Sequence, residues 1–484
     1  MIIEEDVSMK KHGLFKVLLI ILGLLVILSF FVPGRQGTVS YLGIGSVLLN
    51  SVQVFYYFFD TAVFLFVVGG FYGVLSRSDA YKKLLDTIAA KVKSNSKKFV
   101  LIVTVIFAIL SSLTGFTMSL FIFVPFVMSI ILLLGYDKLV AISSTIVAIV
   151  VGYIGGLFVT LRDPSSYSTS FVTFEEFVGV DKFVNTFPKL ILLILGIVLL
   201  IYFINKHIND TETKKVKYEL NDSNDLKISE VKDNYKNIKL WPIITVLSII
   251  LVLLILGYVP WSSLFDITIF SDFHTWLTSL KIGDFEVFNS IITSISYAFG
   301  DWGQLGNYMV ICAILLVFVL IIKFVSKMKF DDIIDSFIDG MKKMLPVAVL
   351  TTFSLTVLVC AYNNGFIEYL ITSATNAMGS LNIVMASVFN IFGSLLYPDI
   401  YYTAYGVYTP LLSAITDESL YQVLALNFQT LNGLVMLIGP TSLILIAGLT
   451  YLDVPYTTWL KYIWRFILML FILIFVVLMI IALI

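Results

Sequence analysis

Long apolar runs alternate with short polar segments along the whole chain. A membrane-spanning helix needs about 20 mostly apolar residues, and runs of this order recur in both halves of the sequence. The predicted spans are residues 14–32, 55–75, 188–205, 240–258, 307–324, 346–362 and 461–484. Three more uncharged runs, which glycine or proline interrupts, cover residues 99–136, 139–161 and 419–452. The pattern predicts an all-α polytopic membrane protein with about 11–13 membrane segments.

The longest uncharged run in the first half, residues 99–136, is about twice the length of one span. It is broken at Thr114 and Gly115 and again at Pro125. The run is either two full helices joined by a tight turn, or one helix followed by a discontinuous, re-entrant segment.

Two lysine-containing segments have apolar positions at helical spacing. They cover residues 76–98 and 328–344, and this pattern is typical of amphipathic helices at the membrane interface. Because lysine favours the cytoplasmic side, the rule places both segments in the cytoplasm.

Composition narrows the class of protein. Of the 484 residues, 59% are hydrophobic and 13% are charged, against about 25% charged residues in soluble domains. This low fraction of charged residues excludes a soluble enzyme and a disordered scaffold. The net charge of −1 gives no positive potential that would attract nucleic acid. The sequence has no P-loop, HExxH or GxSxG motif. We therefore expect a multi-pass protein of the cell membrane that is not an enzyme and whose partners are the lipid bilayer and a small molecule.

A hydrophilic segment, residues 206–239, divides the chain into membrane halves at 1–205 and 240–484. We predict that it is a cytoplasmic linker. Each half has spans, an amphipathic segment and then a span that runs into a broken region. The breaks are at Thr114-Gly115 with Asp163-Pro164, and at Tyr397-Pro398-Asp399 with Gly439-Pro440. Paired interruptions of this kind indicate a transporter binding site near the membrane midplane.

The lysine rule and the repeat pattern disagree on topology. Inverted repeats would place the two amphipathic segments on opposite sides of the membrane. Either residues 259–306, predicted to be external, cross the membrane once more, or the lysine rule misleads for one segment.

Several motifs carry a family resemblance. Residues 64–75 read FLFVVGGFYGVL, 134–139 read LGYDKL, 363–367 read NNGFI and 438–442 read IGPTS. Residues 259–277 contain VPWSSLF and IFSDFHTWL. In this order and spacing they resemble the YfcC family of carriers, which is grouped with bacterial arginine–ornithine antiporters and C4-dicarboxylate carriers in the ion transporter superfamily.

The resemblance implies an elevator-type transporter with two structural repeats, each supplying a re-entrant hairpin and a broken helix. It also implies a homodimer. Gln429, Gly433, Thr441 and Ser442 match the family pattern on the second broken helix, and Asn363 and Asn364 match its Asn-Asp-Gly position. The first half departs: residues 115–119 replace an acidic turn, and Asp163 stands at an Asn-Pro position. Since these are substrate and ion positions, the family's substrate does not carry over.

Asp399 is the sharpest single candidate for a functional charge. It follows a proline between apolar runs, where a carboxylate could hold Na⁺, relay a proton or pair with a substrate amine. The alternative is an ordinary aspartate in a turn at the water interface. A possible Na⁺ site near Asp399 and Thr441 is the only metal site we consider.

The other candidates are weighed in the same way. Arg162 could bind a substrate carboxylate, or form an interfacial salt bridge with Asp163. Neutral polar groups near the breaks could extend a site without the cost of a charge, or serve helix packing. They are Asn363, Asn364, Gln429, Asn432, Thr441 and Ser442, with Thr114, Gly115, Thr117, Thr403 and Gly433 at or near the turns and breaks.

We therefore predict a secondary active transporter of a small organic ion, either an amino acid or a carboxylate. Transport is coupled to Na⁺ or H⁺ or proceeds by exchange, without another cofactor. A channel-like or transport-inactive sensor of the same fold is the alternative.

Overall fold

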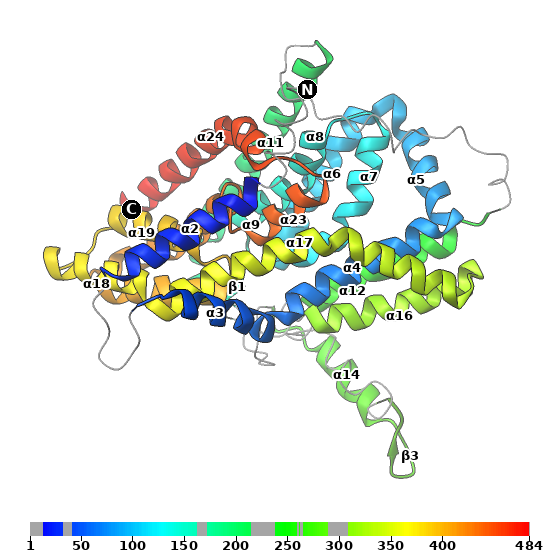
Figure 1. Cartoon of the computed structure of the whole chain (residues 1–484), viewed down its shortest axis with the longest axis horizontal. Helices are drawn as coiled ribbons and strands as arrows, with labels where there is room; N and C mark the ends of the chain where they lie inside the picture. Colours follow the sequence, from blue (N-terminus) through cyan, green and yellow to red (C-terminus); the bar gives the residue numbers. More distant parts are fainter. Residues whose placement is uncertain are drawn as a thin grey trace.

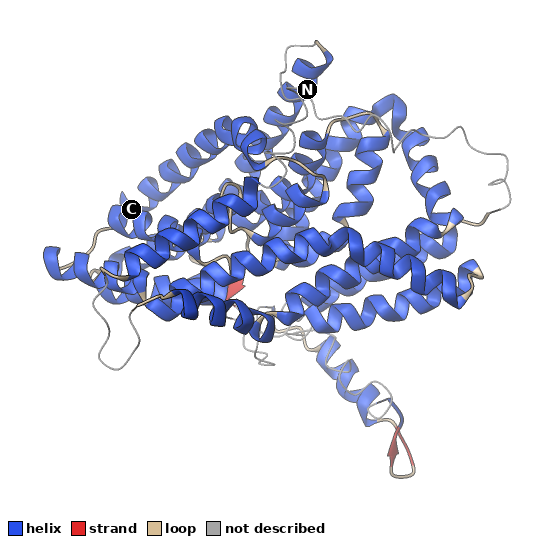
Figure 2. Cartoon of the chain, viewed as in Figure 1, coloured by secondary structure: helices blue, strands red, loops and turns tan. Residues whose placement is uncertain are grey.

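The structure is a computed structural model that describes residues 13–31, 41–161, 172–213, 238–258, 261, 265–288 and 308–483. Figure 2 shows that these residues are mostly helical. Two short antiparallel pairs, β1 (Thr160–Leu161) with β2 (Val172–Thr173) and β3 (Lys281–Ile282) with β4 (Phe285–Glu286), are the strands of the described part. The prediction of an all-α polytopic membrane protein is confirmed.

The helices of the first half precede residue 213. They are α2 (Gly13–Ser29), α3 (Ile44–Tyr57), α4 (Phe59–Arg77), α5 (Asp79–Val92), α6 (Ser96–Thr114), α7 (Val124–Leu133), α8 (Lys138–Ile142), α9 (Ala148–Ile154), α10 (Phe174–Val178) and α11 (Thr186–Glu212). Residues 143–147 form a π-helical turn that joins α8 to α9.

The helices of the second half follow residue 240. They are α12 (Trp241–Tyr258), α14 (Ile269–Ser279), α16 (Tyr308–Ser326), α17 (Phe330–Asn364), α18 (Phe366–Met378), α19 (Ile383–Leu396), α20 (Ile400–Thr403), α21 (Thr409–Ala414), α22 (Tyr421–Met436), α23 (Leu443–Tyr451) and α24 (Tyr456–Leu483). A π-helical turn, residues 404–408, joins α20 to α21.

Five helical segments among the described residues are long and apolar enough to cross a membrane. They are Phe59–Arg77, Asp79–Thr114, Thr186–Glu212, Phe330–Asn364 and Tyr456–Leu483, and six shorter apolar helices accompany them. In α11 and α24 the buried residues form one stripe and many of the other apolar side chains are exposed, as expected for helices that contact lipid.

The two interrupted helices form the centre of the molecule. Residues 139–156, which include α9, are all buried, and so are residues 423–435 of α22. The two helices contact each other, and each is flanked by a long helix of its own half, α9 by α11 and α22 by α24. These two segments, with the neutral polar side chains that they carry, are therefore fully buried.

A pair of long helices runs beside this centre. Figure 1 shows α17 extending along most of the molecule, next to α3 and α4. The backbones of α4 and α17 approach closely at Gly340, where a Cβ atom would lie 2.1 Å from the carbonyl oxygen of Gly69. Glycine faces of this kind allow close helix packing in membranes.

Each half contains a helical hairpin. After α6 the chain turns at residues 115–117 and returns through α7, which contacts α5. After α19 it turns at residues 397–399 and returns through α20 and α21, and α21 contacts α18. The run 99–136 is thus two helical segments joined by a short turn.

The prediction of a separate second amphipathic helix is wrong. Residues 328–344 were expected to form a separate interfacial helix, but residues 330–364 form one continuous helix, α17, through Pro346. The helix that occupies the position of α5, between a long helix and a hairpin, is α18. It carries no lysine or arginine.

This correction resolves the conflict over topology. Figure 1 shows α5 at one end of the long axis and α18 at the other. Lysine-rich α5 fits the cytoplasmic side, where Lys83 donates to the carbonyl of Ile238 near the end of the predicted linker. Because α18 has no lysine, the rule allows it to lie outside.

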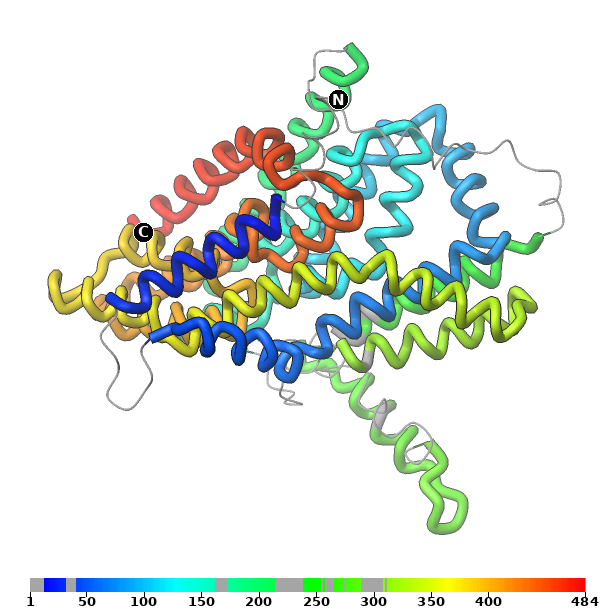
Figure 3. The backbone as a smooth tube through the Cα atoms, viewed as in Figure 1, coloured from blue at the N-terminus to red at the C-terminus, as the bar shows by residue number. Residues whose placement is uncertain are grey.

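The remaining boundaries are only partly described. Helix α11 continues beyond residue 205 to Glu212, and the description resumes at residue 238. Figure 3 shows α14 and the β3–β4 turn projecting from the helical body. One alternative was an extra crossing within residues 259–306 that would include residues 291–299. Residues 291–299 lie outside the described residues, so the division into two repeats stays a prediction.

Candidate functional site

Two helix breaks face each other across the contact between α9 and α22. The helical pattern stops after Ile154 in α9 and after Met436 in α22. Gly433 allows the close approach, because a Cβ atom there would lie 2.4 Å from Cγ1 of Ile154. A broken helix exposes backbone groups that would otherwise be paired, so these breaks can bind polar ligands.

Gln429 joins the two breaks. Its side-chain nitrogen donates to the carbonyl oxygens of Tyr153 and Gly156, both at 2.9 Å, and lies 3.3 Å from that of Ile154. The residue is fully buried, and its Oε1 atom has no hydrogen-bond partner within the described part of the chain. A side chain of the second half thus satisfies carbonyl groups at the break of the first half.

Asn432 extends this contact into a buried polar network. Its Oδ1 accepts from the hydroxyl of Tyr153 at 3.1 Å, and its Nδ2 donates to Ser394 at 3.1 Å. Ser394 donates to Asn390, whose amide donates to the carbonyl of Asn427 at 2.9 Å. The network therefore links α9, α22 and α19.

Sequence reasoning missed three members of this network, Tyr153, Asn390 and Ser394. Asn390 and Ser394 are four residues apart in an apolar helix, so they share one face. That spacing was the available signal. Tyr153 gave none, because a tyrosine in a glycine-rich span also suits helix packing.

The tip of the first hairpin packs on the first break. Gly115 has φ +71°, and a Cβ atom there would lie 2.8 Å from the carbonyl oxygen of Phe158. The hydroxyl of Ser112 donates to the carbonyl of Gly155 at 3.1 Å. Thr114 donates to Leu110 within its own helix, and Thr117 precedes the short helical turn at 118–122. Of the predicted residues here, Gly115 makes the direct contact.

The second hairpin meets the second break in a similar way. The Thr441 hydroxyl donates to the carbonyl of Leu395 at 2.6 Å, while the carbonyl of Thr441 accepts from Ser354 of α17. Ser442 is the N-cap of α23, at 3.5 Å from the nitrogen of Leu445. Thr441 therefore ties the break to both the hairpin and the long helix.

Asp399 is half-buried at the tip of this hairpin. Its Oδ1 accepts from the backbone nitrogens of Tyr401 at 3.0 Å and Tyr402 at 3.2 Å, so it is the N-cap of α20. Thr403 is buried and donates to the carbonyls of Tyr397 and Asp399. Both residues stabilise the turn.

Aromatic rings connect this hairpin tip to the long helices. The ring of Tyr402 lies 5.1 Å from that of Tyr362 in α17 and 5.5 Å from that of Phe58, between α3 and α4. Tyr397 also contacts Tyr362, with ring centroids 6.2 Å apart. We call these four residues the aromatic contact.

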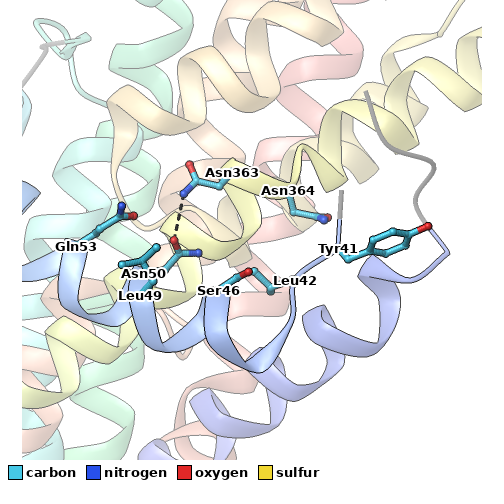
Figure 4. Close-up of a pocket in the computed structure, with 8 residues that line it drawn as sticks. All are labelled: Tyr41, Leu42, Ser46, Leu49, Asn50, Gln53, Asn363 and Asn364. Atoms are coloured by element: carbon cyan, nitrogen blue, oxygen red, sulfur yellow. Dashed lines mark hydrogen bonds between the residues drawn. The ribbon is translucent and has the colours of Figure 1, made fainter. Parts of the chain in front are cut away.

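Asn363 and Asn364 lie apart from the helix breaks, at the end of α17. With α3 they line a pocket of about 340 Å³, which we call the amide pocket (Figure 4). Its polar lining is Tyr41, Ser46, Asn50, Gln53, Asn363 and Asn364, and two leucines complete the wall. Asn363 donates to Oδ1 of Asn50 at 3.4 Å.

The remaining predicted pair, Arg162 and Asp163, lies outside the described residues. Two buried ion pairs that the sequence did not indicate occur elsewhere. Lys189 lies 2.8 Å from Glu175, and His207 lies 2.7 Å from Asp137. Among the described residues, no three His, Cys, Asp or Glu side chains group to hold a metal ion.

Comparison with known proteins places these features in context. The family model of the C4-dicarboxylate anaerobic carriers (DcuC) matches residues 12–483. An uncharacterized protein of Haemophilus influenzae (strain ATCC 51907 / DSM 11121 / KW20 / Rd) is 30% identical over 93 residues, which are 19% of this chain and 18% of that protein. No solved structure matches the chain.

Proposed function

The chain belongs to the C4-dicarboxylate anaerobic carrier family, and on this premise we propose that it is a secondary active transporter of a C4-dicarboxylate in the cell membrane. The arginine–ornithine antiporter relation was the other substrate expectation. The family match supports a carboxylate over an amino acid. The YfcC assignment and the homodimer remain predictions.

The observation that carries the proposal is the meeting of two broken helices with two hairpin tips. Gly115 contacts the first break and Thr441 links the second break to α19, while Gln429 joins both breaks. Interrupted helices in two halves, packed at one buried centre, are the arrangement by which carriers bind small ions.

The proposed coupling ion is Na⁺ or H⁺, with exchange as the other mode. Asp399 supports this choice, since it is a carboxylate on the hairpin whose Leu395 carbonyl contacts Thr441. A carboxylate inside a membrane protein is a candidate for either ion.

Counterflow in proteoliposomes tests the function. Purified protein is reconstituted into liposomes loaded with unlabelled succinate, and labelled succinate is added outside, with Na⁺ or a pH gradient supplied or omitted. We expect transient accumulation of label that excess fumarate or malate suppresses and that excess arginine or ornithine does not. Protein-free liposomes are the control.

Two results would contradict the proposal. Accumulation of arginine or ornithine in place of succinate would assign an amino-acid carrier. Single-channel currents in a planar bilayer, without counterflow, would assign the channel-like alternative.

A further inference from the structure

The amide pocket is separate from the polar network at the helix breaks. One wall is α3 and the other is the C-terminal end of α17. Helix α18 follows that end directly, at the opposite end of the molecule from lysine-rich α5. By the lysine rule the pocket therefore lies toward the outside of the cell.

The walls supply neutral hydrogen-bonding groups. Asn50, Gln53, Asn363 and Asn364 contribute four carboxamides, each with N–H donors and an oxygen acceptor. No charged side chain is among the lining residues. The volume of about 340 Å³ is at the small end for ligand pockets. The pocket therefore suits a small solute with oxygen acceptors.

Helix packing alone does not account for these polar groups. The bond from Asn363 to Asn50 is long, at 3.4 Å, and the amide of Asn50 donates to the sulfur of Cys360, which is a weak acceptor. No hydrogen bond joins the side chain of Ser46 or Gln53 to another described residue. Ser46, Asn50 and Gln53 are spaced to share one face of α3, while Leu48 and Val52 of the same helix are exposed. The polar face of α3 therefore lines the pocket and does not serve helix packing alone.

Residues next to both pocket walls also contact the second hairpin of the candidate site. Phe58 follows Gln53 just past the end of α3, and Tyr362 directly precedes Asn363 on the other wall. Both of these rings contact Tyr402 near the tip of the second hairpin. The aromatic contact thus joins the segments that carry both pocket walls to that hairpin.

We infer that the amide pocket is an outer reception site for the transported carboxylate, which neutral carboxamide N–H groups bind in place of a cation. This inference rests on the proposed function and adds a second, peripheral site to it. Because an uncharged site holds an anion less tightly than a cationic one, it loads and releases the solute readily before the solute reaches the hairpin.

Sided transport kinetics test the inference. Gln53→Leu and Asn363→Leu are each reconstituted, and KM for succinate is measured separately for uptake from the outer face and for efflux. We expect the outer KM to rise about tenfold, as for one lost hydrogen bond to a carboxylate, with the inner KM unchanged. Ser51→Ala is the matched control, because Ser51 is on α3 and bonds only to Val47 of its own helix. An unchanged outer KM in both variants would overturn the inference.

Thiol protection tests binding without relying on transport. Ser46→Cys is exposed to an external, membrane-impermeant maleimide with and without succinate, and Ser51→Cys is its control. The native Cys312 and Cys360 are buried and stay in place. We expect succinate to slow labelling at position 46 alone.

The two assays separate the two proposals. Transport of succinate without protection at position 46 would overturn the reception site and keep the proposed function. Protection without transport would overturn the proposed function and keep the site.

Discussion

At the scale of single residues, Gln429 joins the two helix breaks, because its amide donates across the contact between α9 and α22. Gln429, Asn432 and Thr441 were singled out as neutral polar groups near the break at Gly439-Pro440, and Gly433 by its match to the family pattern. Their partners were not predictable, since Gln429 reaches carbonyl groups more than 270 residues away in the chain. Sequence pattern identifies a polar group in a membrane span, but the tertiary fold decides what satisfies it.

Replacing Gln429 by leucine should damage both stability and transport. The change leaves the buried carbonyls of Tyr153 and Gly156 without their donor, which should lower the free energy of unfolding by about 1–3 kcal/mol. Thermal unfolding in detergent and succinate counterflow measure the two effects. Thr430→Ala is the control, because Thr430 bonds only within α22. Equal effects of the two changes would argue against the bridging role.

Asp399→Asn separates the charge of this residue from its structural role. Asparagine is also a good N-cap, so its amide oxygen can accept the same two backbone N–H groups and the hairpin should fold. We expect normal expression and loss of transport. Normal uptake by this variant would remove the Asp399 charge from the mechanism.

Asp417 provides a matched control for that experiment. It is an exposed N-cap before α22, where the hydroxyl and backbone N–H of Ser419 lower the pKa of its carboxyl group. Asp417→Asn should therefore leave transport intact. If both variants lose transport, the effect of Asp399→Asn cannot be assigned to a charge in the hairpin.

At the scale of elements, hydropathy located the spans and the breaks but not every helix boundary. Residues 328–344 are more polar than the segment after Pro346, so the pattern suggested two elements where α17 is one. Proline is tolerated inside membrane helices, and packing against α4 holds the two parts in line. Conversely, the sequence pattern did not predict α18, because polar and apolar residues are mixed in this part of the chain. A single amphipathic helix of 13 residues gives only a weak hydropathy signal.

The positions of α5 and α18 give a topology prediction. Single cysteines at Lys82 of α5 and Asn376 of α18, both exposed side chains, should react with an impermeant maleimide from opposite sides of the cell membrane. We expect Asn376→Cys to label in intact cells and Lys82→Cys to label only after the cells are opened. Labelling of both from one side would contradict the inverted arrangement.

At the scale of the whole molecule, the two halves are interlocked. Helix α4 packs on α17, α9 on α22 and α11 on α24, and in every pair one helix comes from each half. The sequence predicted two halves but gave no sign of how closely they are joined, because no local pattern records contacts between distant segments.

This interlocking predicts the behaviour of a split protein. Residues 1–225 and 226–484, produced separately, should each lack the partner of their central broken helix and be degraded or aggregate. Co-expressed, they should assemble and restore counterflow, since the cut falls in the hydrophilic segment. Size-exclusion chromatography of each fragment alone and of the pair measures assembly. Stable folding of either fragment alone would show that the contacts between the halves are dispensable.

The Gln429 bridge also sets a thermodynamic constraint on the protein. The carbonyl oxygens at the first break already accept from an amide that belongs to the other half. A cation that displaced that amide from these oxygens would loosen the junction between the halves. By linkage, cation affinity at this break and cohesion of the junction oppose each other by the same free energy. Cation binding that displaces the Gln429 amide therefore weakens the contact between the halves, and a stronger Gln429 contact lowers the affinity for the cation.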